Sequence, residues 1–495
     1  MFVKQKQSGF ALLLFMVVVI GYIIAGYSAG LTTSVQQVNE QKRLKNTKVL
    51  LEAKEALLSY ALNYAVTGEI NKMGKLPCPD HQIANSEGTQ DSPCGGMGIN
   101  AVGYFPYKTI GKGKIEDASG ECLWYVVSGD YKNEAESKLL NWDSVGYLNL
   151  VDENGTLQHE NNEDNFPVAF IISPGISIDQ DRLPDGSLAD CGGGNHTMAS
   201  YLEGGSNIDY STDLPASADT LWTFLTASAA ASSSNVNYND QVIAVYRDEL
   251  WDRVAQIGQL NTDNNSPVDT LAETVTQQLA NCLQVYGNHI NNTDRTLPFA
   301  APIDLTDYRS SSNYDDTASL LAGRFPQNIN NSEAPGDGAL NDIISNDTEV
   351  VFDGSSTGYC GTTGLAANEM FWKNWKDHFF YVVGDDFKPN SSPPALANRC
   401  DDNEKCITVD LNNNLAAVIF FAGEADAAQI RDWTPAIDNK NNIMSYLNGA
   451  NTAFYDGSAV VDYSSFQDDF AYCVLFDDAQ PSGSEFSILK CRDIP

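Results

Sequence analysis

The sequence predicts an α+β fold, with one long N-terminal helix followed by two antiparallel sheets that each pack against a helix. Three features predict it: an uncharged run near the N-terminus, short apolar segments bounded by Gly, Asp and Asn, and a second half that repeats the motif order of the first. Short apolar segments between such turns are typical of strands. A doubly wound parallel fold would need repeated alternation of strands and helices, which is not visible in this chain.

The uncharged run extends from Phe10 to Leu31. A helix of this length measures about 33 Å at 1.5 Å per residue, which is enough to cross the hydrocarbon core of a bilayer. Lys4 and Lys6 precede the run, so we expect the N-terminal end to stay cytoplasmic and the rest of the chain to be exported. A cleavable signal peptide is the alternative, but the run is long for one and no A-x-A site precedes a mature start.

The segment 35–64 continues this helix with an amphipathic pattern. Charged residues fall largely between apolar ones that recur at three- and four-residue spacing, which are Val38, Leu44, Val49, Leu50, Ala53, Leu57, Tyr60, Ala61 and Tyr64. One face of the helix is expected to lie on the globular region of the same chain. Gly68, followed by Pro77 and Pro79, marks the change from helix to loop.

The second half of the chain repeats the first. The matched segments are VGYFP (102–106) and AGRFP (322–326), YVVSGDYK (125–132) and YVVGDDFK (381–388), VAFIISP (168–174) and AVIFFAG (417–423), SYLEG (200–204) and SYLNG (445–449), and YNDQVIAV (238–245) and FQDDFAYC (466–473). The matched segments occur in the same order in both halves, with loops of variable length between them, and this indicates duplication of a helix-plus-sheet unit. We expect a first unit over 68–255 and a second over 256–495, with its helix at roughly 269–286.

Composition excludes some partners. Lys and Arg number 29 against 65 Asp and Glu, which gives a net charge of −36. Such an acidic chain repels nucleic acid and anionic lipid, so neither is expected as a partner. Solubility is the simplest role for this charge.

The chain has an even number of cysteines, and in an exported protein this indicates disulfides. They are Cys78, Cys94, Cys122, Cys191, Cys282, Cys360, Cys400, Cys406, Cys473 and Cys491. No C-x-x-C pair occurs, which argues against zinc clusters and thioredoxin-like chemistry. Full connectivity does not follow from sequence, but Cys78–Cys94 and Cys400–Cys406 are the favoured pairs because each closes a short polar loop.

Motifs for catalysis are few. The run GYSAG at residues 26–30 matches the G-x-S-x-G pattern of hydrolase nucleophiles, but it lies in the uncharged run and not on a strand-to-helix turn. Gly26 and Gly30 are better explained as small residues that let helices approach closely. His196 stands in a glycine-rich loop with no nameable Ser or Cys partner. We therefore expect no enzymatic activity.

No cofactor is expected, and calcium is the one metal ion for which the sequence offers candidate ligands. Hard cations bind clustered oxygen ligands. The candidate ligands are Asp401, Asp402 and Asn403, which lie between two cysteines, and Asp438 in the loop 438–442. No EF-hand spacing is present, so a solvated acidic loop is the simpler interpretation.

The N-terminus resembles a type IV prepilin in the order of its parts: a short basic leader, Gly9, and Phe10 opening an apolar helix. The resemblance implies a leader over 1–9, a pilin-type helix over 10–67, cleavage after Gly9 by a prepilin peptidase and methylation of Phe10. The family's usual glutamate, five residues into the mature chain, is replaced here by Leu14. That departure favours a minor, tip-type pilin or pseudopilin.

Motifs further along also resemble a recurrent pilin-like domain. They are the LPCP segment at 76–79, the aromatic-Pro turn YFPY at 104–107, and an Asp-x-x-Gly step that leads into a Tyr-Val-Val strand. Each is weak alone, and together they are moderately specific. Both halves of the chain are therefore expected to be pilin-like units.

The resemblance implies a minor pilin or pseudopilin of a type IV pilus or a type II secretion-like filament, placed at the tip and serving adhesion, priming or surface contact. Leu14, Gly21, Gly26 and Gly30 would lie on the assembly helix. Expected partners are other pilins or pseudopilins, the prepilin peptidase, the inner-membrane assembly machinery and a surface ligand. The expected location is the inner membrane before assembly, with a periplasmic globular region, and afterwards an extracellular filament. A membrane-anchored adhesin that never enters a filament is the main alternative, and an anchored hydrolase is a weaker one.

The change Gly9→Leu should block processing, because the peptidase of the resembling family needs a small residue at this position. N-terminal sequencing of the mature protein measures this directly. A Gly9→Leu chain that still begins at Phe10 would contradict the prepilin interpretation.

Overall fold

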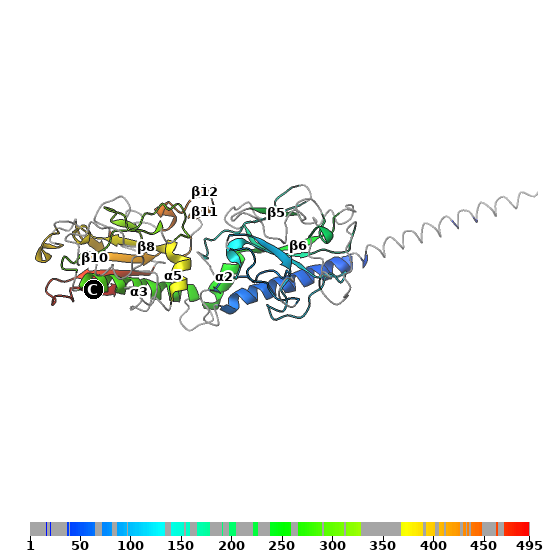
Figure 1. Ribbon diagram of the computed structural model, residues 1–495, viewed down its shortest axis with the longest axis horizontal. Coiled ribbons are helices and arrows are strands. Elements are labelled where there is room, and N and C mark those ends of the chain that lie inside the picture. Colours follow the sequence, from blue (N-terminus) through cyan, green and yellow to red (C-terminus); the bar gives the residue numbers. More distant parts are fainter. Residues whose placement is uncertain are drawn as a thin grey trace, which may run out of the picture.

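The computed structural model shows an α+β protein with two helix-and-sheet units (Figure 1). It describes residues 16, 20, 37–38, 40–64, 72–81, 87–96, 98–133, 140–152, 155–158, 166–178, 191, 198–203, 221–225, 238–258, 266–289, 292–310, 313–327, 368–389, 393–400, 405–409, 412–425, 429–431, 433–434, 437–447, 462–463 and 470–494. The units follow one another along the long axis of the molecule. Helix α3 (Pro267–Asn288) runs along the second unit, and α2 (Arg247–Gly258) lies between the units.

Two predictions about the N-terminus are corrected. None of the helices within the described ranges combines the length and the apolar character that a bilayer crossing requires. This contradicts the long N-terminal transmembrane helix, and with it the anchoring in the inner membrane by such a helix. The described helix at 40–64 alternates charged and apolar side chains, whereas a spanning helix needs roughly 20 consecutive, mainly apolar residues. Of the apolar run 10–31, only Met16 and Ile20 are described; both are helical and exposed.

The first unit packs the helix at 40–64 against an antiparallel sheet. The strands are β1 (Ala101–Tyr104), β2 (Trp124–Val127), β4 (Pro167–Ser173) and β6 (Gln241–Tyr246), in the order β1-β2-β4-β6. Leu50, Ala53, Leu57 and Ala61 of the helix are buried in the core, as their spacing predicts. A separate parallel pair, β3 (Leu148–Val151) and β5 (Trp222–Leu225), lies outside this sheet.

The second unit uses α3 in the same way. Its central strands are β7 (Ala322–Arg324), β8 (Phe379–Val383), β10 (Asn412–Phe421), β14 (Phe470–Phe476) and β15 (Phe486–Lys490), all antiparallel to their neighbours. The short strands β9 (Ile407–Val409) and β13 (Asp462–Tyr463) extend the sheet, and β11 (Trp433–Thr434) pairs with β12 (Ile437–Asp438). Helix α3 begins where Ser266 and Asp269 form a reciprocal capping box with Pro267 in the first turn.

Short helical segments connect these elements. They are α5 (Glu369–Trp375), η2 (Gly129–Tyr131), η5 (Met198–Ser200), η11 (Lys376–His378), η12 (Asp385–Phe387), η13 (Leu396–Asn398), η14 (Ile443–Ser445) and η16 (Cys491–Asp493). The segment η11 directly precedes β8, so its side chains lie at the start of a buried strand.

The two sheets share one connectivity. The order β1-β2-β4-β6 corresponds to β7-β8-β10-β14, and each pair of matched sequence segments falls on corresponding elements. The hydroxyl of Tyr125 donates to the carbonyl of Pro77 at 3.1 Å, and Tyr381 donates to Pro298 at 3.0 Å. The sequence matches therefore extend to individual hydrogen bonds.

A close backbone approach explains the shared glycine of the two G-x-F-P motifs. A Cβ on Gly103 would lie 2.8 Å from the carbonyl oxygen of Asp80, and one on Gly323 would lie 2.0 Å from that of Ala301. The backbones of Asp80 and Tyr104 exchange two hydrogen bonds there, as do those of Ala301 and Arg324. Any side chain at either glycine would force these paired strands apart.

The changes Tyr125→Phe and Tyr381→Phe test the equivalence of the two units. Each removes a fully buried hydroxyl that donates to a proline carbonyl, so each should lower the free energy of unfolding by about 1 kcal/mol. Chemical denaturation followed by circular dichroism measures both. A clear loss at one tyrosine with none at the other would contradict equivalent roles.

Candidate functional site

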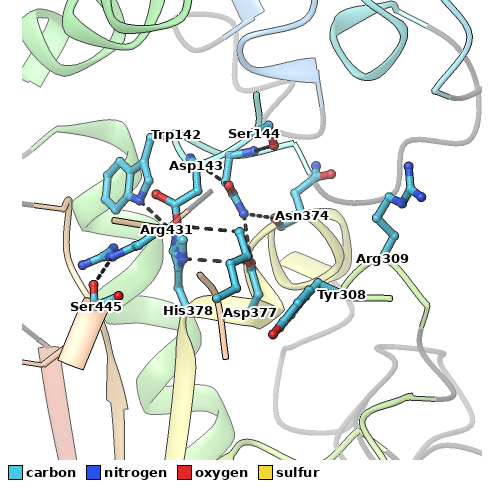
Figure 2. Close-up of polar contacts among 12 residues, drawn as sticks. Trp142, Asp143, Ser144, Tyr308, Arg309, Asn374, Asp377, His378, Arg431 and Ser445 are labelled. Atoms are coloured by element: carbon cyan, nitrogen blue, oxygen red, sulfur yellow. Dashed lines mark hydrogen bonds and ion pairs between the residues drawn. The ribbon is translucent and has the colours of Figure 1, made fainter. Parts of the chain in front are cut away.

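Buried charged groups meet where the two units join (Figure 2). The loop 140–147 of the first unit supplies Asp143, η11 supplies Asp377 and His378, and the turn after β12 supplies Lys440. Asp143 is 5% exposed, Lys440 is 2% exposed, and Asp377 and His378 have no exposed surface. Burial this complete is rare for charged side chains unless they are paired. These four residues, with Asn141, are called the junction cluster below.

Lys440 supplies the positive charge of the junction cluster. Its Nζ contacts Asp377 Oδ2 directly and lies 3.6 Å from Asp143 Oδ2. Burial acts to lower the pKa of Lys440, but the neighbouring Asp377 carboxylate outweighs it and the pKa is raised. The pKa of Asp377 is lowered to about 2, because the attraction of Lys440, His378 and Arg324 exceeds the opposing effect of burial. Asp377 and Lys440 are therefore an ion pair at neutral pH.

His378 lies between the two carboxylates. Its Nε2 is 3.1 Å from Asp143 Oδ2, and its Nδ1 is 3.9 Å from Asp377 Oδ1. Burial lowers its pKa to about 4 despite the two acidic neighbours, so the ring is neutral at pH 7. The indole N–H of Trp142 also points at Nε2 at 3.0 Å. One ring nitrogen is thus approached by an N–H and by a carboxylate, an arrangement that can hold or pass a proton.

Hydrogen bonds from the first unit fix this geometry. The backbone N–H of Asp143 donates to Asn141 Oδ1 at 3.0 Å, a local turn typical of Asn. The Asn141 side-chain amide donates across the junction to Asp377 Oδ1 and to the carbonyl of Asn374, each at 2.9 Å. The Asn374 side chain accepts from the backbone of Leu140 at 3.0 Å. The loop is therefore locked onto the second unit by bonds in both directions.

Arg324 of β7 lies beneath the cluster and is completely buried. All three of its guanidinium nitrogens donate to backbone carbonyls: Nε to Ile303 at 3.0 Å, NH2 to Lys440 at 2.6 Å, and NH1 to Asp377. Its charged carbon also lies 4.8 Å from the ring centre of Tyr308 and 5.0 Å from that of Tyr446. One side chain thus fixes the backbones that carry the two members of the ion pair.

The junction continues as an aromatic layer. Trp142 contacts Trp375 edge to face with ring centres 4.5 Å apart, and Trp251 of α2 contacts Trp375 at 5.7 Å. A single hydrophobic cluster includes residues from both units. These tryptophan side chains shield the charged groups of the junction cluster from solvent.

Two groups in the described residues have the spacing of metal ligands. In the junction cluster, ligand atoms of Asp143, Asp377 and His378 lie within 4.8 Å of one another, but the Lys440 ammonium already supplies a cation there. The second group joins Glu87 to Cys122 and Cys191, and these two cysteines form a disulfide. In both groups the candidate ligand atoms are therefore already engaged, by the Lys440 ammonium in the first group and by the disulfide in the second.

The predicted disulfides Cys78–Cys94 and Cys400–Cys406 are both present. The structure also contains Cys122–Cys191 and Cys473–Cys491, and Cys282 is disulfide-bonded as well. Cys360 lies outside the described residues, as do Gly9, Phe10, Leu14, Gly21, Gly26, Gly30, His196, Asp401, Asp402 and Asn403. Asp438, the remaining calcium candidate, is a paired residue of the short strand β12.

Sequence reasoning missed the junction cluster. Asn141 and Asp377 are 236 residues apart, and nothing in the pattern of either segment indicates their pairing. One local signal was available: Asp377 and His378 directly precede the apolar run FFYVV, where charge adjoins a fully buried strand.

Comparison with known proteins gave no match to a family model, to a curated protein or to a solved structure.

The stability of the folded protein should rise with pH between about pH 4 and pH 6.5. In this window the unfolded chain binds a proton at His378 that the folded chain does not, so unfolding is favoured toward the acidic side. The full effect of this shift is about 3 kcal/mol. Denaturation at several pH values should show a flatter profile for His378→Gln than for the native chain. His289→Gln, a partly buried residue outside the junction cluster, is the control, and an unchanged slope in His378→Gln would contradict the assignment.

Proposed function

We propose that this chain is a minor-pilin-type or pseudopilin-type subunit of a type IV pilus or a type II secretion-like filament. It would be present in few copies at one end, where its two units make adhesive, priming or surface contacts. Its partners would be other pilins or pseudopilins, and its role would be non-enzymatic. The prepilin-like segment around Gly9 and Phe10 and the duplicated domain motifs support the proposal from sequence.

The observation that carries the proposal is the packing of the helix at 40–64. It buries Leu50 and Leu57 against the first sheet and leaves Leu44 and Leu51 exposed at 57% and 48%. Leu44 and Leu51 are seven residues apart, so they lie on the same side of the helix. A subunit whose helix packs between its own sheet and neighbouring helices needs both faces to be apolar.

The disulfides and the junction cluster support a binding or assembly role over catalysis. Bonds such as Cys78–Cys94 and Cys473–Cys491 form and persist in oxidising compartments, where surface filaments assemble. The carboxylates of Asp143 and Asp377 are nearly or completely buried, so an external substrate has no access to them. The alternative is a binding protein or adhesin that does not enter a filament.

The double change Leu44→Asp and Leu51→Asp should reduce incorporation into filaments by about tenfold or more, because two buried apolar contacts would be replaced by desolvated charges. Immunoblots of sheared, pelleted filaments, normalised to total protein, measure this. The control is Ser59→Asp with Asn63→Asp, which adds the same charge at exposed polar positions on another side of the helix at 40–64. Absence of the native chain from pelleted filaments would favour the free binding protein.

Antibody raised against residues 297–478 should label filaments at one end. A chain with two globular units fits poorly into a tightly stacked shaft, whereas an end leaves space for both. Electron microscopy of labelled, sheared filaments gives the distribution. Regular decoration along the shaft would contradict placement at the tip.

A further inference from the structure

The Lys440 and Asp377 side chains meet in an enclosed, water-poor site. Lys440 Nζ contacts Asp377 Oδ2, and both side chains are almost completely buried. The ring centre of Tyr308 is 6.0 Å from Nζ. Two other lysine–carboxylate pairs among the described residues differ in this respect. Lys388 and Asp385 are 31% and 35% exposed, and Lys490 and Glu273 are 12% and 30% exposed.

The backbone around this pair is fixed by one guanidinium group. Arg324 NH1 donates to the carbonyl of Asp377, and NH2 donates to that of Lys440. The two segments are therefore positioned relative to each other independently of the salt bridge. Holding a nucleophile and an acyl carbon in place in this way can replace a large part of the entropic barrier to their reaction.

Two groups of the first unit complete the arrangement. The Asn141 amide donates to Asp377 Oδ1 at 2.9 Å, where negative charge would develop if a nucleophile attacked Asp377 Cγ. Asp143 Oδ2 lies 3.6 Å from Lys440 Nζ and accepts no hydrogen bond from the part of the chain that the structure describes. It is therefore placed to carry a proton between the amine and the acyl oxygen.

Neighbouring segments of the first unit, although not the aligned residues, are joined by a covalent bond. Cys122, just before β2, is joined to Cys191, seven residues before η5. Asp377 lies just before β8, the counterpart of β2, and Lys440 lies three residues before η14, the counterpart of η5. Segments that precede corresponding elements are thus tied together in both units, by a disulfide in one and by the buried Lys–Asp contact in the other.

We propose that Lys440 and Asp377 become joined by an intramolecular amide bond, promoted by Asn141 and Asp143. Asp143 relays a proton from the Lys440 ammonium to the Asp377 carboxylate, and the free amine then attacks Cγ of the resulting neutral carboxyl group. The C–N bond forms, a C–O bond of the carboxyl group breaks, and the oxygen leaves as water with protons delivered through Asp143. An ammonium and a carboxylate give one amide and one water, so no oxidant, reductant or other reactant is required. Asp143 ends in its starting state.

The reaction depends on docking of the two units, because the two promoting groups come from the first unit. Asn141 and Asp143 belong to the first unit, whereas Lys440 and Asp377 belong to the second. The amide therefore forms only after the two units have docked. Once formed, it closes residues 377–440 into a covalent ring that persists when the units separate.

Mass spectrometry of the full chain, reduced and denatured, tests the proposal. After N-terminal sequencing has accounted for any leader cleavage and methylation, the native chain should be lighter by one water than its mature sequence requires, and digestion should yield a branched peptide joining Asp377 to Lys440. Lys440→Arg, which keeps the charge, and Asp143→Asn, which keeps the shape, should both lose the branched peptide and regain the water. Lys388→Arg is the matched control and should retain the bond.

Folding is monitored separately by circular dichroism and by disulfide mapping of each variant. A folded native chain of full mass would overturn the proposal, as would a branched peptide that persists in folded Asp143→Asn at the native yield. Loss of water without a branched peptide, as in a cyclic imide at another aspartate, would also overturn it. If Lys440→Arg fails to fold, the native mass and Asp143→Asn still decide the outcome.

Discussion

The need to neutralise buried charge where the two units meet constrains the rest of the structure. An isolated carboxylate or ammonium in a protein interior costs several kcal/mol, so Asp377 and Lys440 depend on each other, and Asp143 depends on the second unit. Arg324 satisfies the backbone carbonyls on either side of this pair, and the aromatic layer around Trp375 excludes water from it. Sliding or rotating one unit on the other would break these contacts together. The relative position of the units is thus set by electrostatics as well as by apolar packing.

The two sheets share one connectivity, whereas the junction is built from unlike segments of the two units. The Tyr125 and Tyr381 hydroxyl bonds are retained in both units, because each closes the same Leu-Pro segment onto a sheet. At the junction the units differ: the first presents the loop with Asn141 and Asp143, and the second presents the residues that contact it, which are Asn374, Asp377, His378 and Lys440.

Much of the fold could be predicted from sequence, because strands and helices depend on local patterns. The apolar run at 167–173 became a fully buried strand, and the repeated motif order placed a helix at roughly 269–286, within α3 (267–288). Two short disulfides followed from loop length alone. The prediction of a membrane-spanning helix was wrong for the described residues. Hydropathy measures how well a segment would partition into lipid, and it does not by itself establish that the segment forms a helix of the required length. The junction cluster was out of reach, because its members come together only through tertiary contacts across 236 residues.

The disulfide Cys473–Cys491 has a consequence for how the protein bears mechanical load. The bond joins β14, an inner strand of the second sheet, to the residue directly after β15, the outer strand. Tension applied at the C-terminal end would otherwise peel β15 away one hydrogen bond at a time. The covalent tie passes that tension to β14, which is held by β10 on its other side, so β15 cannot be pulled away alone while the disulfide is intact.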